Sequence, residues 1–197
     1  MRLTIGFHKR MLLAASGVLL TGCLHIAPVP HLEDQRDSKA MAKLMLQFSG
    51  QARGLLEKER DVANELKITL DEADNVPPEN FRHRFESYAD GFISIRDQRR
   101  KILVTILTTN YTSPMVLAFQ KKTVQLIGDE VKRTDSWVRA TQNVKLRSEL
   151  GRKTVFPEYA ALNQQLQGFL ALTQENAIST QLNALIEEFR ISEDDLK

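Results

Sequence analysis

The chain contains one cysteine, Cys23, whose thiol could take part in chemistry. A lone cysteine can be an inert residue, a reactive thiol or a point of covalent attachment. Because there is no second cysteine, a disulfide within the chain is excluded. Cys23 follows an aliphatic residue and two small ones, Leu20-Thr21-Gly22, and it stands at the end of an apolar run. Its position therefore favours attachment.

The residues before Cys23 have the layout of a secretory signal peptide. Arg2, Lys9 and Arg10 make the start basic, and a short apolar run follows at residues 11–20. A helix that spans a bilayer needs about 20 apolar residues, so this run is too short to cross one. A basic start, a short apolar stretch and small residues are typical of a signal peptide. We expect residues 1–22 to be removed.

The tetrapeptide Leu20-Thr21-Gly22-Cys23 resembles the lipobox of bacterial prolipoproteins, and all four positions match. The resemblance implies cleavage before Cys23, a thioether-linked diacylglycerol on its sulfur and an acyl chain such as palmitate on its new amino group. It also implies a membrane anchor on the periplasmic side of the cell envelope. In this class an Asp after the cysteine commonly retains the protein in the inner membrane, so Leu24 favours the outer membrane. The resemblance covers this segment alone.

Residues 23–33 are predicted to tether the lipid to the folded part of the chain. Pro28 and Pro30 favour an extended backbone there. His25 and His31 also lie in this segment, where solvated side chains are favoured over a metal site or a pH sensor.

The charge of the chain argues against nucleic acid as a partner. The precursor has a formal net charge of +2. Removal of residues 1–22 leaves 24 basic against 25 acidic side chains, a net charge of −1. The basic footprint of a nucleic-acid-binding protein is therefore missing.

The prolines predict an all-α fold. Pro78, Pro114 and Pro157 are separated by long stretches without proline, and the first turn of a helix is where a helix tolerates this residue. The spacing predicts an elongated up-down-up-down four-helix bundle over residues 34–197. Its helices are expected at residues 34–75, 78–111, 114–150 and 157–190. An alternative has the first helix broken near Gly50 and Gly54, because glycine weakens a helix.

Apolar residues recur at steps of three and four, which indicates a buried seam on each helix. The predicted seams are Met41, Met45, Phe48, Ala52, Leu55, Glu59, Val62 and Leu66; Phe81, Phe85, Tyr88, Phe92, Ile95, Arg99, Ile102 and Ile106; Leu117, Val124, Val131 and Val138; and Leu162, Leu166, Phe169, Ile178, Leu182, Leu185 and Phe189. In the last, Thr173 and Asn176 interrupt the apolar pattern.

Glu59 and Arg99 are charged residues at seam positions of two neighbouring helices. An antiparallel pairing of these helices brings them to within about one turn of each other. We predict a buried ion pair that sets the register of the helices. The alternative is a charged pocket for an anionic ligand.

The sequence favours neither an enzyme nor a metalloprotein. His83 is the one histidine after the tether, so a paired-histidine metal site is not expected. No nucleophile motif or phosphate-binding glycine loop is present. We therefore expect no catalytic residues, no metal and no cofactor. The basic run at residues 96–101 is expected to be a solvated face, with contact to anionic lipid headgroups or an acidic partner as the alternative.

These features predict a membrane-anchored periplasmic lipoprotein that acts as a non-enzymatic protein-binding module, in assembly, scaffolding or regulation of an envelope system. One alternative is an immunity or exclusion lipoprotein that protects the envelope. Another is a carrier or sensor that binds a small ligand between helices, near Glu59, Arg99, Thr173 and Asn176.

Overall fold

The computed structural model describes residues 32–72, 78–148, 157–172 and 175–197, and every regular element in these ranges is a helix. The helices are α1 (Leu32–Asp71), α2 (Pro78–Thr108), α3 (Pro114–Ser148), α4 (Pro157–Ala171), α5 (Ala177–Phe189) and α6 (Glu193–Leu196). The predicted all-α class is therefore confirmed. The helices α2, α3 and α4 begin at Pro78, Pro114 and Pro157, as the proline spacing predicts.

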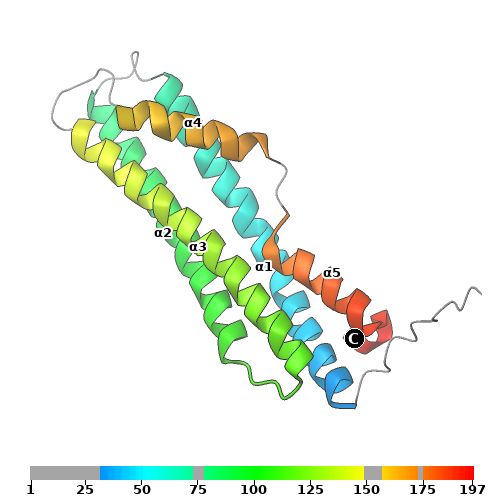
Figure 1. Ribbon diagram of the computed structural model, residues 1–197. Coiled ribbons are helices and arrows are strands. Elements are labelled where there is room, and N and C mark those ends of the chain that lie inside the picture. Colours follow the sequence, from blue (N-terminus) through cyan, green and yellow to red (C-terminus); the bar gives the residue numbers. More distant parts are fainter. Residues whose placement is uncertain (1–31, 73–77, 149–156, 173–174) are drawn as a thin grey trace, which may run out of the picture.

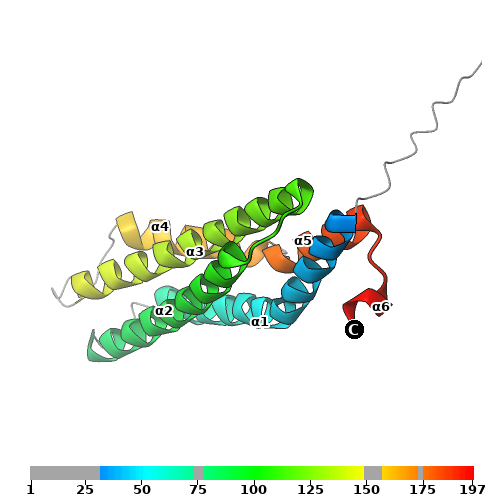
Figure 2. The same ribbon diagram turned by 90° about the horizontal axis from the view of Figure 1, so that it is seen from below.

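Three long helices, α1, α2 and α3, run side by side along the length of the molecule (Figure 1; Figure 2). At 1.5 Å per residue, the 40 residues of α1 extend about 60 Å. The shorter helices α4 and α5 both contact α1 and α3, and α6 contacts α1. No helix in the described ranges is both long enough and apolar enough to cross a bilayer.

The helix α1 is continuous, so the alternative with a break near Gly50 and Gly54 is wrong. A Cβ atom built on either glycine would meet nothing within 4 Å, which places both glycines away from the neighbouring helices. Ala52 and Leu55 between and beside them are buried. Packing of the opposite face thus offsets the low helix propensity of glycine.

The predicted single helix over residues 157–190 is wrong, because the chain leaves the helix after α4 and begins a new one at α5. The exposed carbonyls at the end of α4 find a partner on another helix. The guanidinium of Arg60 in α1 donates to the carbonyls of Leu170 (2.9 Å) and Leu172 (2.8 Å). This side chain replaces the hydrogen bonds that a continuing helix would have supplied.

The start of α5 is also capped by side chains. Asn176 is the N-cap, and its side-chain oxygen accepts from the backbone N–H of Ser179 at 2.8 Å. Glu130 of α3 accepts from the backbone N–H of Ala177 at 3.1 Å. The break therefore follows from polar groups that only the folded protein brings together.

The described members of the predicted seams on α1, α2, α4 and α5 are buried or half-buried; of the seam predicted for α3, Val138 is buried, Val124 and Val131 are half-buried and only the position of Leu117 is wrong. Leu117 of that seam is 41% exposed. The inward face of α3 follows another heptad pattern, in which five of nine positions are polar: Val116, Gln120, Thr123, Ile127, Glu130, Thr134, Trp137, Thr141 and Val144. Threonines suit such a face because the hydroxyl bonds the carbonyl one turn back, as Thr123 does to Phe119 at 2.8 Å.

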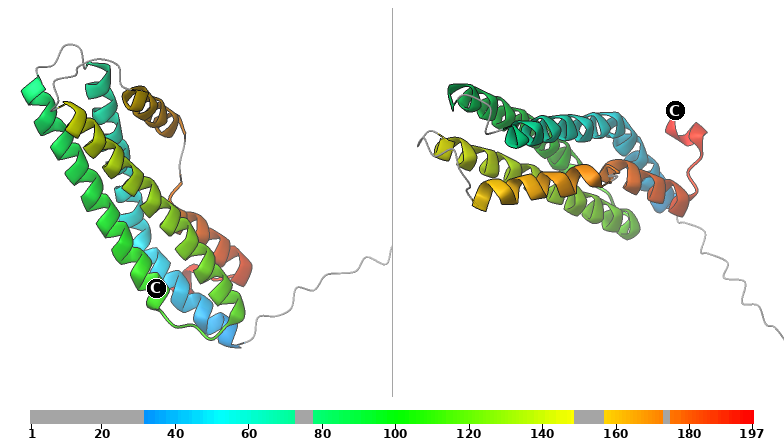
Figure 3. Two further views of the ribbon diagram at one scale, coloured as in Figure 1. Left: turned by 60° about the vertical axis from the view of Figure 1, so that its left-hand side comes forward. Right: turned by 90° about the horizontal axis from the view of Figure 1, so that it is seen from above.

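At one end of the molecule, the start of α1 holds the connection between α2 and α3 (Figure 3). The carboxylate of Asp37 accepts from the backbone N–H groups of Thr112 and Ser113, and Ser113 also donates to Asp34. Ser113 caps α3 by accepting from the N–H of Val116 at 3.2 Å. The start of α1 and the start of α3 are thereby joined.

Asp37 makes this joint sensitive to acid. The backbone N–H groups of Ser113 and Thr112 hold the pKa of its carboxyl at about 2, below the ordinary value. A carboxyl whose pKa is lower in the folded than in the unfolded state stabilises the fold above the unfolded pKa. That contribution is lost as the pH falls from about 4 towards 2.

We expect Asp37→Asn to lower the free energy of unfolding by about 1–2 kcal/mol near pH 7, because it removes charge-assisted hydrogen bonds. The difference from the unmodified protein should shrink between pH 4 and pH 2. Urea unfolding at several pH values measures both effects. Asp61→Asn, at an exposed position of the same helix, is the matched control. A pH-independent difference would contradict the role given to the charge.

Candidate functional site

The structure brings the two predicted seam charges together in the interior. Nη2 of Arg99 lies 2.8 Å from Oε2 of Glu59. The Glu59 side chain is fully buried and the Arg99 side chain is 2% exposed. A pair so completely removed from water has to be satisfied by further polar groups, because each charge loses its hydration.

Those groups come from α3 and were not predicted from the sequence. Nη1 of Arg99 donates to the hydroxyl of Thr134, and Nε lies 3.4 Å from Oε2 of Glu130. Arg133 donates to Glu59 at 2.8 Å. The hydroxyl oxygen of Thr134 lies 3.0 Å from Oε1 of Glu59 and 2.9 Å from the carbonyl oxygen of Glu130, so its one proton can be donated to either acceptor. We refer to Glu59, Arg99, Glu130, Arg133 and Thr134 as the charge cluster.

The charge cluster also reaches the fourth and fifth helices. Oε1 of Glu130 accepts a hydrogen bond from the backbone N–H of Ala177 at the start of α5. The guanidinium of Arg133 lies 5.2 Å from the ring centroid of Phe169 in α4, in cation–π geometry. Side chains or backbone groups from α1, α2, α3, α4 and α5 therefore meet in one place.

Two carboxylates and two guanidiniums balance in the charge cluster. Burial would raise the pKa of Glu59, but hydrogen bonds from Arg133 and the charge of Arg99 outweigh it, so the pKa is lowered. Glu59 is thus ionised near neutral pH, and its carboxylate oxygens accept hydrogen bonds. The arrangement is suited to holding helices together, and its charges are directed at one another.

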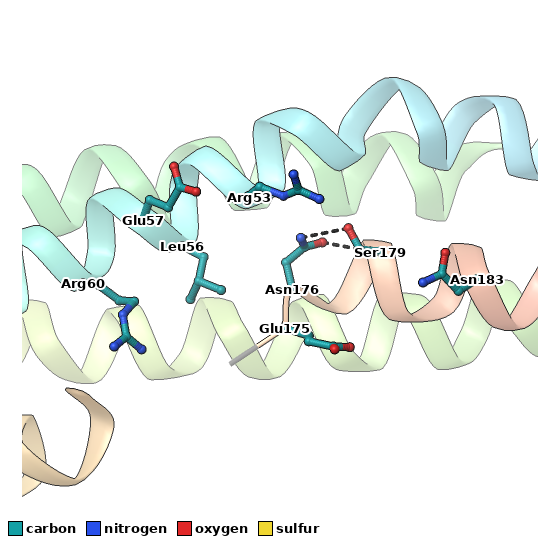
Figure 4. Close-up of a pocket in the computed structure, with 8 residues that line it drawn as sticks. All are labelled: Arg53, Leu56, Glu57, Arg60, Glu175, Asn176, Ser179 and Asn183. Atoms are coloured by element: carbon teal, nitrogen blue, oxygen red, sulfur yellow. Dashed lines mark hydrogen bonds between the residues drawn. The ribbon is translucent and has the colours of Figure 1, made fainter. Parts of the chain in front are cut away.

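A groove opens beside the charge cluster, at the break between α4 and α5. It lies between α1 and the start of α5 and has a volume of about 510 Å³ (Figure 4). Its lining is polar and carries both signs of charge: Arg53, Leu56, Glu57, Arg60, Glu175, Asn176, Ser179 and Asn183. Arg53, Glu57 and Asn183 are exposed and make no hydrogen bond or ion pair within the described residues.

The groove corresponds only in part to the ligand site that the sequence suggested. Asn176 lines it, whereas Glu59 and Arg99 lie in the interior and do not. Thr173 lies outside the described residues. Asn176 and Arg60 use polar atoms to cap α5 and α4. The groups left to meet a ligand or partner are those of Arg53, Glu57 and Asn183.

The remaining residues singled out from the sequence add no site within the described ranges. No group of three His, Cys, Asp or Glu side chains that could hold a metal ion occurs there. His83 is exposed and lies 3.6 Å from Glu86 on the same helix. Cys23, the lipobox, His25 and His31 lie outside the described residues, as does the predicted tether up to residue 31.

Comparison with known proteins gives no relative. The chain matches no family model, no curated protein and no solved structure.

We expect Arg99→Leu to lower the free energy of unfolding by about 3–5 kcal/mol, because it leaves buried carboxylates with one partner fewer. The double variant Glu59→Leu with Arg99→Leu should lose less than the two single variants added together. Denaturant unfolding of the four proteins gives the coupling between the two residues.

The matched control is Arg96→Leu, on the same helix. Arg96 pairs with Asp97 and Asp135 at the surface, so its loss should cost about 1 kcal/mol or less. Equal costs for Arg96→Leu and Arg99→Leu would show that the buried pair contributes no more than a surface pair.

Proposed function

We propose that this protein is a lipid-anchored protein of the bacterial cell envelope that acts by binding another protein and not by catalysis. The observation that carries the proposal is the lipobox Leu20-Thr21-Gly22-Cys23 at the end of a signal peptide, with its only cysteine at the modified position. Two or three acyl chains on Cys23, at about 0.8 kcal/mol per buried methylene, would give stable anchoring. Leu24 favours the outer membrane, with the folded part on the periplasmic side.

The architecture supports a binding module. In our proposal α4 and α5 together occupy the fourth position of an elongated bundle, since both contact α1 and α3 and, among the described residues, neither contacts α2. The ionisable groups of the charge cluster are directed at each other, which favours a structural role for them. What the bundle offers to other molecules is its outer surface.

On that surface, the groove between α1 and α5 is the contact site that we favour. Arg53, Glu57 and Asn183 present a cation, an anion and an amide without partners of their own within the described residues. A polar protein segment could satisfy all three. The same groove favours, as the second candidate, a small polar ligand held between the helices.

We expect Cys23→Ser to abolish the lipid anchor, because the thioether requires the sulfur. The altered precursor should keep its signal peptide and the protein should leave the membrane fraction. Globomycin, which blocks the lipoprotein signal peptidase, should likewise cause the precursor to accumulate. Mass spectrometry of the mature N-terminus identifies the acyl groups. Unchanged processing and fractionation under both treatments would refute the lipoprotein assignment.

The groove can be tested by replacing Asn183 with a photoreactive amino acid in the full-length lipidated chain. Irradiation of intact cells should then yield an adduct with one envelope protein. The same replacement at Gln164, which is exposed on α4 outside the groove, should not. If neither site yields a protein adduct, the protein-binding proposal fails. Stabilisation of the protein by a small-molecule extract, lost in Arg53→Ala, would favour the ligand instead.

A further inference from the structure

The end of the molecule formed by the α2–α3 connection exposes large apolar side chains. Val104 and Leu107, in the last two turns of α2, are 53% and 56% exposed. Met115 and Leu117, in the first turn of α3, are 46% and 41% exposed. We call these four residues the apolar tip. The exposure of four large apolar side chains at the same end of the molecule is the feature from which we argue contact with something apolar.

On α2 and α3, the charged side chains next to the apolar tip are all basic, while the acidic Asp34 and Asp37 of α1 bond the connection between these helices. Residues 98–128 contain no aspartate or glutamate, although 25 of the 197 residues of the chain are acidic. The basic residues of this stretch are Arg99, buried in the charge cluster, and the exposed Arg100, Lys101, Lys121 and Lys122. The exposed cations lie one to two turns behind the apolar tip on α2 and α3. Apolar residues in front and cations behind them match the layered chemistry of a bilayer surface.

The apolar tip lies at the end of the molecule where the lipid would be attached. Hydrogen bonds from Thr112 and Ser113 to Asp37 hold the α2–α3 connection against the first turns of α1. Leu32, the first residue of α1, is 86% exposed. Nine residues, 23–31, separate it from the lipidated end, and a chain spans at most about 3.3–3.6 Å per residue. The start of α1 is therefore within about 30 Å of an acylated Cys23.

We propose that the apolar tip docks on the phospholipid bilayer, with Val104, Leu107, Met115 and Leu117 in the headgroup region and the lysines against lipid phosphates. The proposal rests on the lipid anchor proposed above. The protein would then contact the membrane in two ways, through the lipid on Cys23 and through the apolar tip. The bundle then stands on the bilayer, and Arg53 of the groove lies about 30 Å along α1 from Leu32.

The test uses the full lipidated chain in vesicles of phosphatidylcholine, with or without phosphatidylglycerol. A fluorophore is placed on Thr108→Cys, next to the apolar tip, or on Gln164→Cys in α4; both positions are exposed. Lipids with a nitroxide at the headgroup should quench the Thr108 label at least about twofold, since the tip meets the interface. The Gln164 label should be nearly unchanged. Phosphatidylglycerol should increase the effect, and added salt should reduce that increase.

Two double variants of exposed residues test whether the apolar side chains and the lysines cause the quenching. Val104→Ser with Leu107→Ser, and Lys101→Glu with Lys121→Glu, should each lower the quenching of the Thr108 label. The matched controls are Ile68→Ser, which is also an exposed apolar residue of a helix, and Lys58→Glu, an exposed lysine of α1. These controls should leave the quenching unchanged, since neither residue belongs to the tip.

The outcomes separate the two proposals. If the protein floats with the vesicles but the Thr108 label is not quenched, the lipid anchor stands and the docking of the tip is refuted. If the protein does not associate with vesicles through Cys23, both proposals fail. If the label is shielded only when other envelope proteins are added, a protein and not the bilayer covers the tip, which also refutes this inference.

Discussion

The burial of Glu59 against Arg99 is the constraint on which the arrangement of the helices depends. Removing two charges from water is unfavourable unless every direction in which they bond is filled. Nη1 of the planar Arg99 guanidinium donates to Thr134, whereas Nη2 and Nε lie at ion-pair distance from Glu59 (2.8 Å) and Glu130 (3.4 Å) without hydrogen-bond geometry. A lysine could not reach three partners in one plane. Since these partners belong to α1 and α3, the cluster fixes the axial position of α2 relative to both.

The same requirement explains why the last helical segment is divided. Glu130 shares its carboxylate between Arg99 and the first N–H of α5, so α5 has to begin beside the cluster. Arg60, one residue after Glu59, donates hydrogen bonds to the carbonyls of Leu170 and Leu172 at the end of α4. A continuous helix would leave both side chains without these partners. The groove is the space that this division opens, which links a feature of the core to the surface that we propose for binding.

The sequence allowed prediction of the helical class, the helix starts at prolines and the two charged seam residues, because each depends on local geometry or on a break in an apolar pattern. It did not allow prediction of the α3 face, where Thr123 and Thr134 are buried although neither is apolar. Glu130 and Thr134 could have been found from their heptad spacing to Ile127 and Trp137. The break before Asn176 was beyond local rules, because Arg60 and Glu130 that cap it lie far away in the chain.

The distribution of charge adds a physical argument for orientation. Residues 98–128 carry five basic side chains and no acidic one, so the rest of a chain cleaved before Cys23 has a net charge of −6. The adjoining ends of α2 and α3 are thus positive, although the start of α1 at the same end adds the acidic Glu33, Asp34 and Asp37. Near an anionic lipid surface, the exposed cations of α2 and α3 are attracted to the lipid. Charge and apolar exposure therefore favour the same contact, although they arise from different residues. In the proposed envelope setting, contact through the α2–α3 end would leave the groove between α1 and α5 away from the bilayer and open to a partner.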